Sequence, residues 1–235
     1  MGRWPRAGHA PGGTAGRGTF CVALNYLHPH LSEAQLRQIA QRHEIGAHTL
    51  THPTLTEIPL EQAREEIQGS KAWLEDVLGQ PVRCFCYPRG ALNAALQAEV
   101  EAAGYQAARG AGVHQIQVGP RYAMNTSLQV YPLPLRPLPS IAPWRGWRTR
   151  TVPLRQAHQA QRQRGLPLAA LRAWLPWASA WVDHVQVVGG VFHLWGHSWE
   201  IEQYGQWADL EALLRRLQAS GGRPVVNHEL VEWAV

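Results

Sequence analysis

Two histidines separated by three residues form the most chemically informative pattern in this 235-residue chain. His48 and His52 follow the short run Glu44-Ile45-Gly46-Ala47, and Pro53 comes directly after them. Neutral imidazoles carry nitrogen lone pairs, so two of them on one rigid segment commonly begin a divalent metal site. The nearby threonines and Pro53 favour a strand that ends in a loop, because the residue before a proline avoids the α region. The spacing alone is weak evidence, since such histidines can equally be structural.

The chain around these histidines alternates between short apolar runs and amphipathic segments. Gly79 predicts the end of the clearest helix, and Pro176 is expected to kink or divide a tryptophan-rich one. Residues 110–153 are expected to form extended loops around one or two short strands. The predicted strands cover 18–24, 44–47, 82–87, 105–108, 190–195 and 225–226, and the predicted helices cover 33–43, 60–78, 91–103, 166–187 and 206–217. This alternation predicts a parallel α/β sheet or barrel, whose functional residues follow the carboxyl ends of its strands.

The composition indicates a globular chain, with 45% hydrophobic and 17% charged residues. The net charge is +5, and arginines gather between Trp144 and Arg164, which we interpret as a solvated basic loop without a nucleic acid partner. The three cysteines are expected to be buried free thiols. No apolar run reaches membrane-spanning length and the start lacks an apolar signal core, so we expect no membrane span and, by default, a cytoplasmic location.

Four segments in order resemble the motifs of the NodB-homology polysaccharide deacetylases, a carbohydrate esterase family. Residues 43–53 resemble the family's histidine metal motif with its flanks, and residues 60–81 resemble the helix that follows it. Residues 83–90, Arg-Cys-Phe-Cys-Tyr-Pro-Arg-Gly, resemble the third motif. Residues 191–200 resemble the last motif, in a variant that carries Trp-Glu after the histidine. The similarity covers about 18–105 and returns at 189–217.

The resemblance implies a distorted (β/α) barrel over residues 19–235, missing or altered at its first strand, after an N-terminal tail of residues 1–18. It also implies a divalent metal, such as zinc, held by His48 and His52 with an aspartate. His197 would protonate the leaving group, and the backbone N–H of Arg89 would help to hold the oxyanion. The implied substrate-binding residues are Arg83, Tyr87, Arg89, Trp195 and Trp199. Each tryptophan can equally be core, Tyr87 is more typical of a pocket wall than of a catalyst, and the mid-strand His193 is expected to pack.

The chain departs from the family at the first motif, Thr-Phe-Asp-Asp, which would lie upstream of Gly18. The sequence has only three aspartates, Asp76, Asp183 and Asp209, and none of them follows a predicted strand. The fourth motif, an aspartate near a tryptophan, is not evident around 121–139. The chain therefore lacks the third metal ligand and the general base, which typically contributes about 10²–10⁴-fold to the rate.

Three explanations of this departure stay open. Either the chain begins after the acidic strand of an active enzyme, or it is a pseudoenzyme, or His28, His30 or Glu200 replaces the aspartate. The sequence thus predicts a metal-dependent hydrolase that removes acetyl groups from a carbohydrate polymer. The alternative is a carbohydrate-binding protein without catalysis.

Overall fold

The computed structural model describes residues 16–26, 31–110, 112–135 and 150–233. Its larger sheet has four parallel strands in the order β1-β2-β3-β4. Their bounds are β1 Thr19–Val22, β2 Glu44–Ala47, β3 Cys84–Cys86 and β4 Ala107–Arg109. Pairing joins Val22 to Ala47 and Ala47 to Phe85, so the strands finish at one edge of the sheet. The histidine pair follows directly from this edge.

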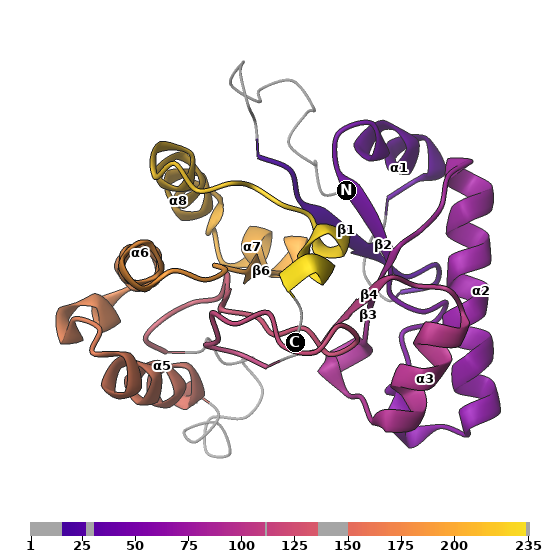
Figure 1. The fold of residues 1–235 in the computed structure, drawn as a ribbon. Coiled ribbons are helices and arrows are strands. Elements are labelled where there is room, and N and C mark those ends of the chain that lie inside the picture. Colours follow the sequence, from indigo (N-terminus) through magenta and orange to yellow (C-terminus); the bar gives the residue numbers. More distant parts are fainter. Residues whose placement is uncertain (1–15, 27–30, 111, 136–149, 234–235) are drawn as a thin grey trace.

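Three helices cover the outer face of this sheet, as Figure 1 shows. They are α1 (Glu33–Ala40), α2 (Leu60–Leu78) and α3 (Ala94–Ala102). The Ser32–Gln35 capping box begins α1, and Gly79 ends α2 in the left-handed conformation with φ 66°, as predicted. The core between these helices and the strands includes Leu36, Ile45, Ala47, Ile67, Leu74, Phe85, Leu96 and Val100.

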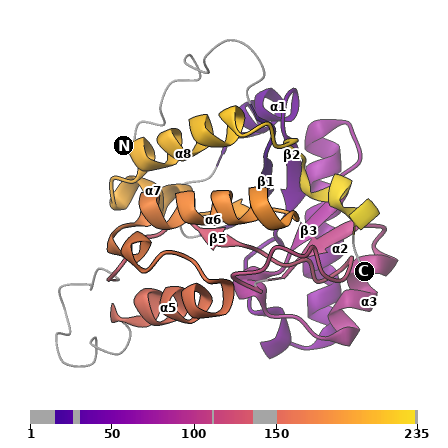
Figure 2. The same cartoon turned by 60° about the vertical axis from the view of Figure 1, so that its left-hand side comes forward.

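The second half of the chain builds a separate aromatic core. A two-stranded parallel sheet pairs β5 (Leu128–Gln129) with β6 (Leu194–Trp195). The helices α5 (Val152–Arg164), α6 (Trp174–Val188) and α8 (Trp207–Ala219) lie one above another in Figure 2. The buried Trp174, Trp177 and Trp181 of α6 dominate this core. The short helix α7 (Ser198–Gln203) follows β6.

The structure corrects several sequence predictions in this half. The helical stretch predicted from residue 166 divides at Ala173, whose φ of −158° is extended, into a 3₁₀ segment (Leu168–Arg172) and α6. Pro176 therefore lies in the first turn of α6, where its missing N–H has no intrahelical partner to lose. Part of the predicted basic loop is the helix α5. Val225 and Val226 precede a 3₁₀ segment (Asn227–Trp233) and form no strand.

The described strands form two parallel sheets, and no hydrogen-bonded closure between those sheets is seen among the described residues. All three cysteines are free, with Cys84 buried and Cys21 and Cys86 half-buried. None of the described helices is long and apolar enough to cross a bilayer.

Candidate functional site

The loop from His48 to His52 is held in an unusual backbone conformation by α2. Thr49 and His52 both have positive φ, 70° and 61°, which residues with side chains rarely adopt. The buried Glu66 of α2 accepts hydrogen bonds from the backbone N–H groups of Leu50 (2.7 Å) and Thr51 (2.9 Å) and from the Thr51 hydroxyl (2.5 Å). The Thr49 hydroxyl accepts the N–H of His52 at 3.0 Å. These contacts fix the direction in which the second histidine leaves the sheet.

His48 is anchored to the neighbouring strand. Its Nδ1–H donates to the Cys86 carbonyl at 2.7 Å, which leaves Nε2 with the lone pair. The centroids of the His48 and His52 rings are 4.7 Å apart, and the interplanar angle is 73°. The pKa of His48 is raised overall. Burial alone would lower this pKa, but the charge of Cys86 and the hydrogen bonds to Cys86 have the larger combined effect.

His52 stays neutral at ordinary pH. Burial, followed by the charges of His48, Arg89 and His197, lowers the pKa of His52 to about 4. The ring of Tyr26 lies 4.4 Å from the ring of His52. The charges of Arg89 and His197 therefore lie within electrostatic reach of His52. Residues that follow β2, β3 and β6 therefore act electrostatically on His52.

The turn after β3 positions Tyr87 and Arg89. Arg89 has a φ of 57°, and its side chain is exposed, whereas Tyr87 is buried and lies against Phe85 at 5.2 Å. Burial raises the pKa of Tyr87, and its hydroxyl has no hydrogen-bond partner among the described residues. Tyr87 is thus part of the core beneath the larger sheet's helices.

The second half of the chain contributes His197. Its Nδ1 lies 2.5 Å from Oε2 of Glu200, a buried carboxylate in α7. The His197 ring stacks on the Trp199 ring, with centroids 5.7 Å apart and an interplanar angle of 23°. The Trp195 ring lies nearly perpendicular to it, with centroids 5.6 Å apart and an interplanar angle of 89°. The two predicted tryptophans therefore flank the predicted acid. His193 lies apart in the interior, where burial and then Arg109 lower its pKa well below the ordinary value.

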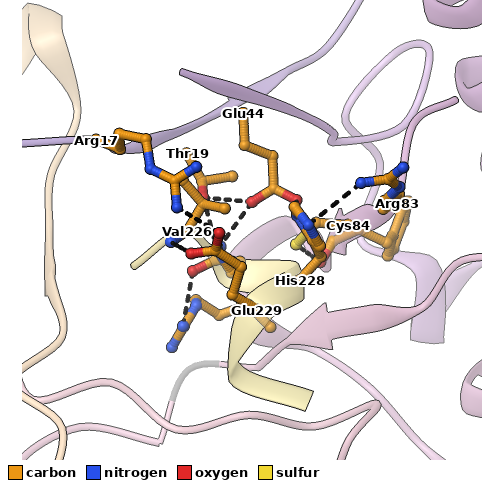
Figure 3. Close-up of polar contacts among 11 residues, drawn as sticks. Arg17, Thr19, Glu44, Arg83, Cys84, Val226, His228 and Glu229 are labelled. Atoms are coloured by element: carbon orange, nitrogen blue, oxygen red, sulfur yellow. Dashed lines mark hydrogen bonds and ion pairs between the residues drawn. The ribbon is translucent and has the colours of Figure 1, made fainter. Parts of the chain in front are cut away.

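Arg83 does not join this group. It precedes β3, whereas Tyr87 and Arg89 follow it, so Arg83 lies at the opposite end of the strand. Figure 3 shows it beside His228, which links it to Glu44. The distances are 3.4 Å from Arg83 Nη1 to His228 Nε2 and 2.8 Å from His228 Nδ1 to Glu44 Oε1. Arg83 as a substrate-binding residue stays a prediction, and the structure places it at the end of β3 opposite to Tyr87 and Arg89.

The histidine pair fits part of a metal centre. The carbonyl contact of His48 is the outer contact that a metal-ligating imidazole typically makes, and His52 is neutral as a ligand must be. No cluster of three or more His, Cys, Asp or Glu suited to a metal occurs within residues 16–26, 31–110, 112–135 and 150–233. Catalytic zinc usually has three protein ligands, so these residues do not complete such a centre. His28 and His30 lie outside the described residues.

Two supporting residues were missed in the sequence. Glu66 holds the histidine loop from 15 or 16 positions away, and no local pattern indicates that contact. The spacing of His197 and Glu200, three apart at the start of a helix, is a signal that could have predicted their contact.

Residues 15–108 match the polysaccharide deacetylase family. The chitin deacetylase of Colletotrichum lindemuthianum is 14% identical with a TM-score of 0.53, and the match covers 91% of this chain and 75% of that one. A mutant of BA3943, described as a carbohydrate esterase family 4 pseudoenzyme with restored enzymatic activity, is 13% identical with a TM-score of 0.50, over 93% of this chain and 58% of that one. A Bacillus cereus polysaccharide deacetylase is 23% identical with a TM-score of 0.37, over 43% of this chain and 33% of that one. No curated protein matches significantly.

These matches confirm the family resemblance and the α/β fold of carbohydrate esterase family 4 deacetylases. The chain spans only about a third of the length of the Bacillus cereus structure.

Proposed function

Since residues 15–108 match the polysaccharide deacetylase family, we propose that this chain is a hydrolase that removes acetyl groups from a carbohydrate polymer. The observation that carries the proposal is the pairing of the His48 and His52 rings, 4.7 Å apart just after β2, with Arg89 and His197 among the charges that lower the pKa of His52. These groups come from distant segments, and each has a distinct use in acyl transfer.

The chain's own residues would orient the substrate and move a proton. The flanking Trp195 and Trp199 would contact the acetyl group or the sugar ring, since aromatic faces provide large apolar area with defined geometry. The Arg89 N–H would donate to the developing oxyanion. His197 would give a proton to the leaving group, as general acids do within hydrogen-bond reach.

His48 and His52 would hold a divalent metal such as zinc, which when bound supplies polarisation of the acetyl carbonyl and of a water. A third ligand would have to come from outside the described residues. Hydrolysis therefore depends on that further group.

Acetate release from acetylated chito-oligosaccharides, measured with added zinc or cobalt, tests this function. We expect release from the chain, or from the chain with an aspartate-bearing strand restored ahead of residue 18, and a loss in His52→Ala. The exposed His158 supplies a matched control, because His158→Ala removes an imidazole from α5 and not from the site. Absence of release from both forms would contradict the proposal.

A second function, carbohydrate binding without catalysis, is favoured by the incomplete ligand set among the described residues. Titration calorimetry with chitin and peptidoglycan fragments would detect it. We expect binding that weakens in Trp199→Ala and does not require metal. Heat changes equal to those of buffer would exclude this function for these polymers.

A further inference from the structure

Glu200 is the one carboxylate that contacts His197 among the described residues. Its Oε2 lies 2.5 Å from His197 Nδ1, and its side chain is only 7% exposed. A carboxylate accepts and does not donate, so this contact requires the proton on Nδ1 and leaves Nε2 for proton exchange.

Glu200 is itself held in place. Nε2 of Gln129 donates to the same carboxylate oxygen at 3.2 Å, and the backbone carbonyl of Gln129 accepts the indole N–H of Trp174 at 2.7 Å. The chain of contacts therefore runs from α6 through β5 to α7 and ends on His197. With Trp195 and Trp199 against the ring, this arrangement limits rotation of the imidazole.

We propose that Glu200 is the positioning residue of His197, which fixes the Nδ1–H tautomer and the ring orientation needed for proton transfer. The inference rests on the proposed function of His197 as the acid. It assigns Glu200 a role other than metal ligand or general base, because its carboxylate is buried and occupied by His197 and Gln129. The positioning device thus belongs wholly to the second half of the chain.

The test reads the tautomer of His197 directly by ¹⁵N NMR of the imidazole nitrogens, with His197→Gln identifying the resonances. We expect the Nδ1–H form in the unmodified chain, a shift toward Nε2–H in Glu200→Ala, and retention of Nδ1–H in Glu200→Gln, whose amide oxygen can still accept. Glu202→Ala is the matched control, because Glu202 is an exposed carboxylate of the same helix that accepts from Trp207.

Kinetic measurements on the same variants separate an effect on kcat from an effect on KM. Where acetate release is measurable, we expect kcat to fall about 10²-fold in Glu200→Ala with little change in KM, the lower end of general-acid effects. An Nε2–H tautomer in the unmodified chain, or an unchanged tautomer in Glu200→Ala, overturns the inference. Absence of acetate release bears on the proposed function alone, since the tautomer is read without substrate. Should Glu200→Ala fail to fold, loss of Nδ1–H in Glu200→Leu against its retention in Glu200→Gln decides the question.

Discussion

The two histidines of the first motif have different environments although their spacing suggests equal roles. His48 is tied to the Cys86 carbonyl inside the sheet, whereas His52 leaves the sheet with a positive φ and contacts Tyr26. The orientation of His48 is therefore fixed by a neighbouring strand, and that of His52 by its loop. The pKa of His48 is raised and that of His52 is lowered, so the two imidazoles differ in how readily they take up a proton.

The low pKa of His52 is measurable. In the metal-free chain we expect its imidazole to titrate near pH 4, because burial and then nearby positive charges disfavour its protonation. Arg89→Gln removes one of these charges and should raise the pKa of His52. NMR titration checks both values, and a His52 that titrates near the ordinary 6.5 in the unmodified chain would contradict the geometry of the site.

His114 gives a pH dependence of stability away from the site. Burial, and then the charge of Arg164, lowers the pKa of His114 to about 4, and its ring stacks on Trp181 at 5.7 Å. The unfolded chain takes up this proton near pH 6.5, so between 6.5 and 4 the unfolded state binds more protons. The contribution of His114 to the free energy of unfolding is therefore present above pH 6.5 and is lost as the pH falls to 4.

His114→Asn tests this contribution, because asparagine tolerates the positive φ of 59° at this position. Denaturant unfolding at several pH values should show a shallower decline between pH 6.5 and 4 in the variant, even if its overall stability is lower. Equal slopes in the two proteins would show that His114 is not buried as described.

At the scale of elements, α2 has a second task besides packing. Its apolar side builds the core, and its Glu66 reaches over to hold the histidine loop. The boundaries of α2 were predicted correctly from period and from Gly79, because local propensity and capping determine them. The task of Glu66 was not predicted, since it depends on which loop the fold brings beside the helix.

Removal of Glu66 should loosen the loop. In Glu66→Ala the N–H groups of Leu50 and Thr51 lose their acceptor, and we expect a loss of about 1–3 kcal/mol in the free energy of unfolding. Glu65→Ala, an exposed neighbour on the same helix, should change stability little. Denaturant unfolding measures the stability of both variants. Faster amide hydrogen exchange at residues 50 and 51 in Glu66→Ala, but not in Glu65→Ala, would show that the loss of stability arises in the histidine loop. Equal melts for the two variants would refute the anchoring role.

At the scale of the whole molecule, polar residues gather at both ends of the larger sheet. One end holds the histidine pair and Arg89, and the other holds the network around Glu44 in Figure 3. There Glu44 accepts the N–H of Asn227 at 2.8 Å and thereby joins the C-terminal segment to the strands. The second network supports the fold, and the first supports the proposed chemistry.

Two exposed arginines on either side of β3 distinguish these ends. Arg89→Ala should weaken carbohydrate binding about tenfold, the loss expected for one hydrogen bond to a charged group, whereas Arg83→Ala should leave binding unchanged. Calorimetric titration of both variants with the same oligosaccharide makes the comparison. A larger loss in Arg83→Ala would mean that the substrate reaches the opposite end.

Local patterns were enough to predict the alternation of strands and helices, the order of the motifs and the residues after strand ends, because these depend on periodicity, capping and residue type. The folded chain was needed to show that Arg83 lies at the opposite end of β3 from Arg89, that Glu66 and Glu200 contact the histidine segments, and that two tryptophans flank His197. Those facts depend on contacts between segments that are far apart in the sequence, such as Arg83 with His228, 145 positions apart. Local spacing carries no information about which distant side chains meet.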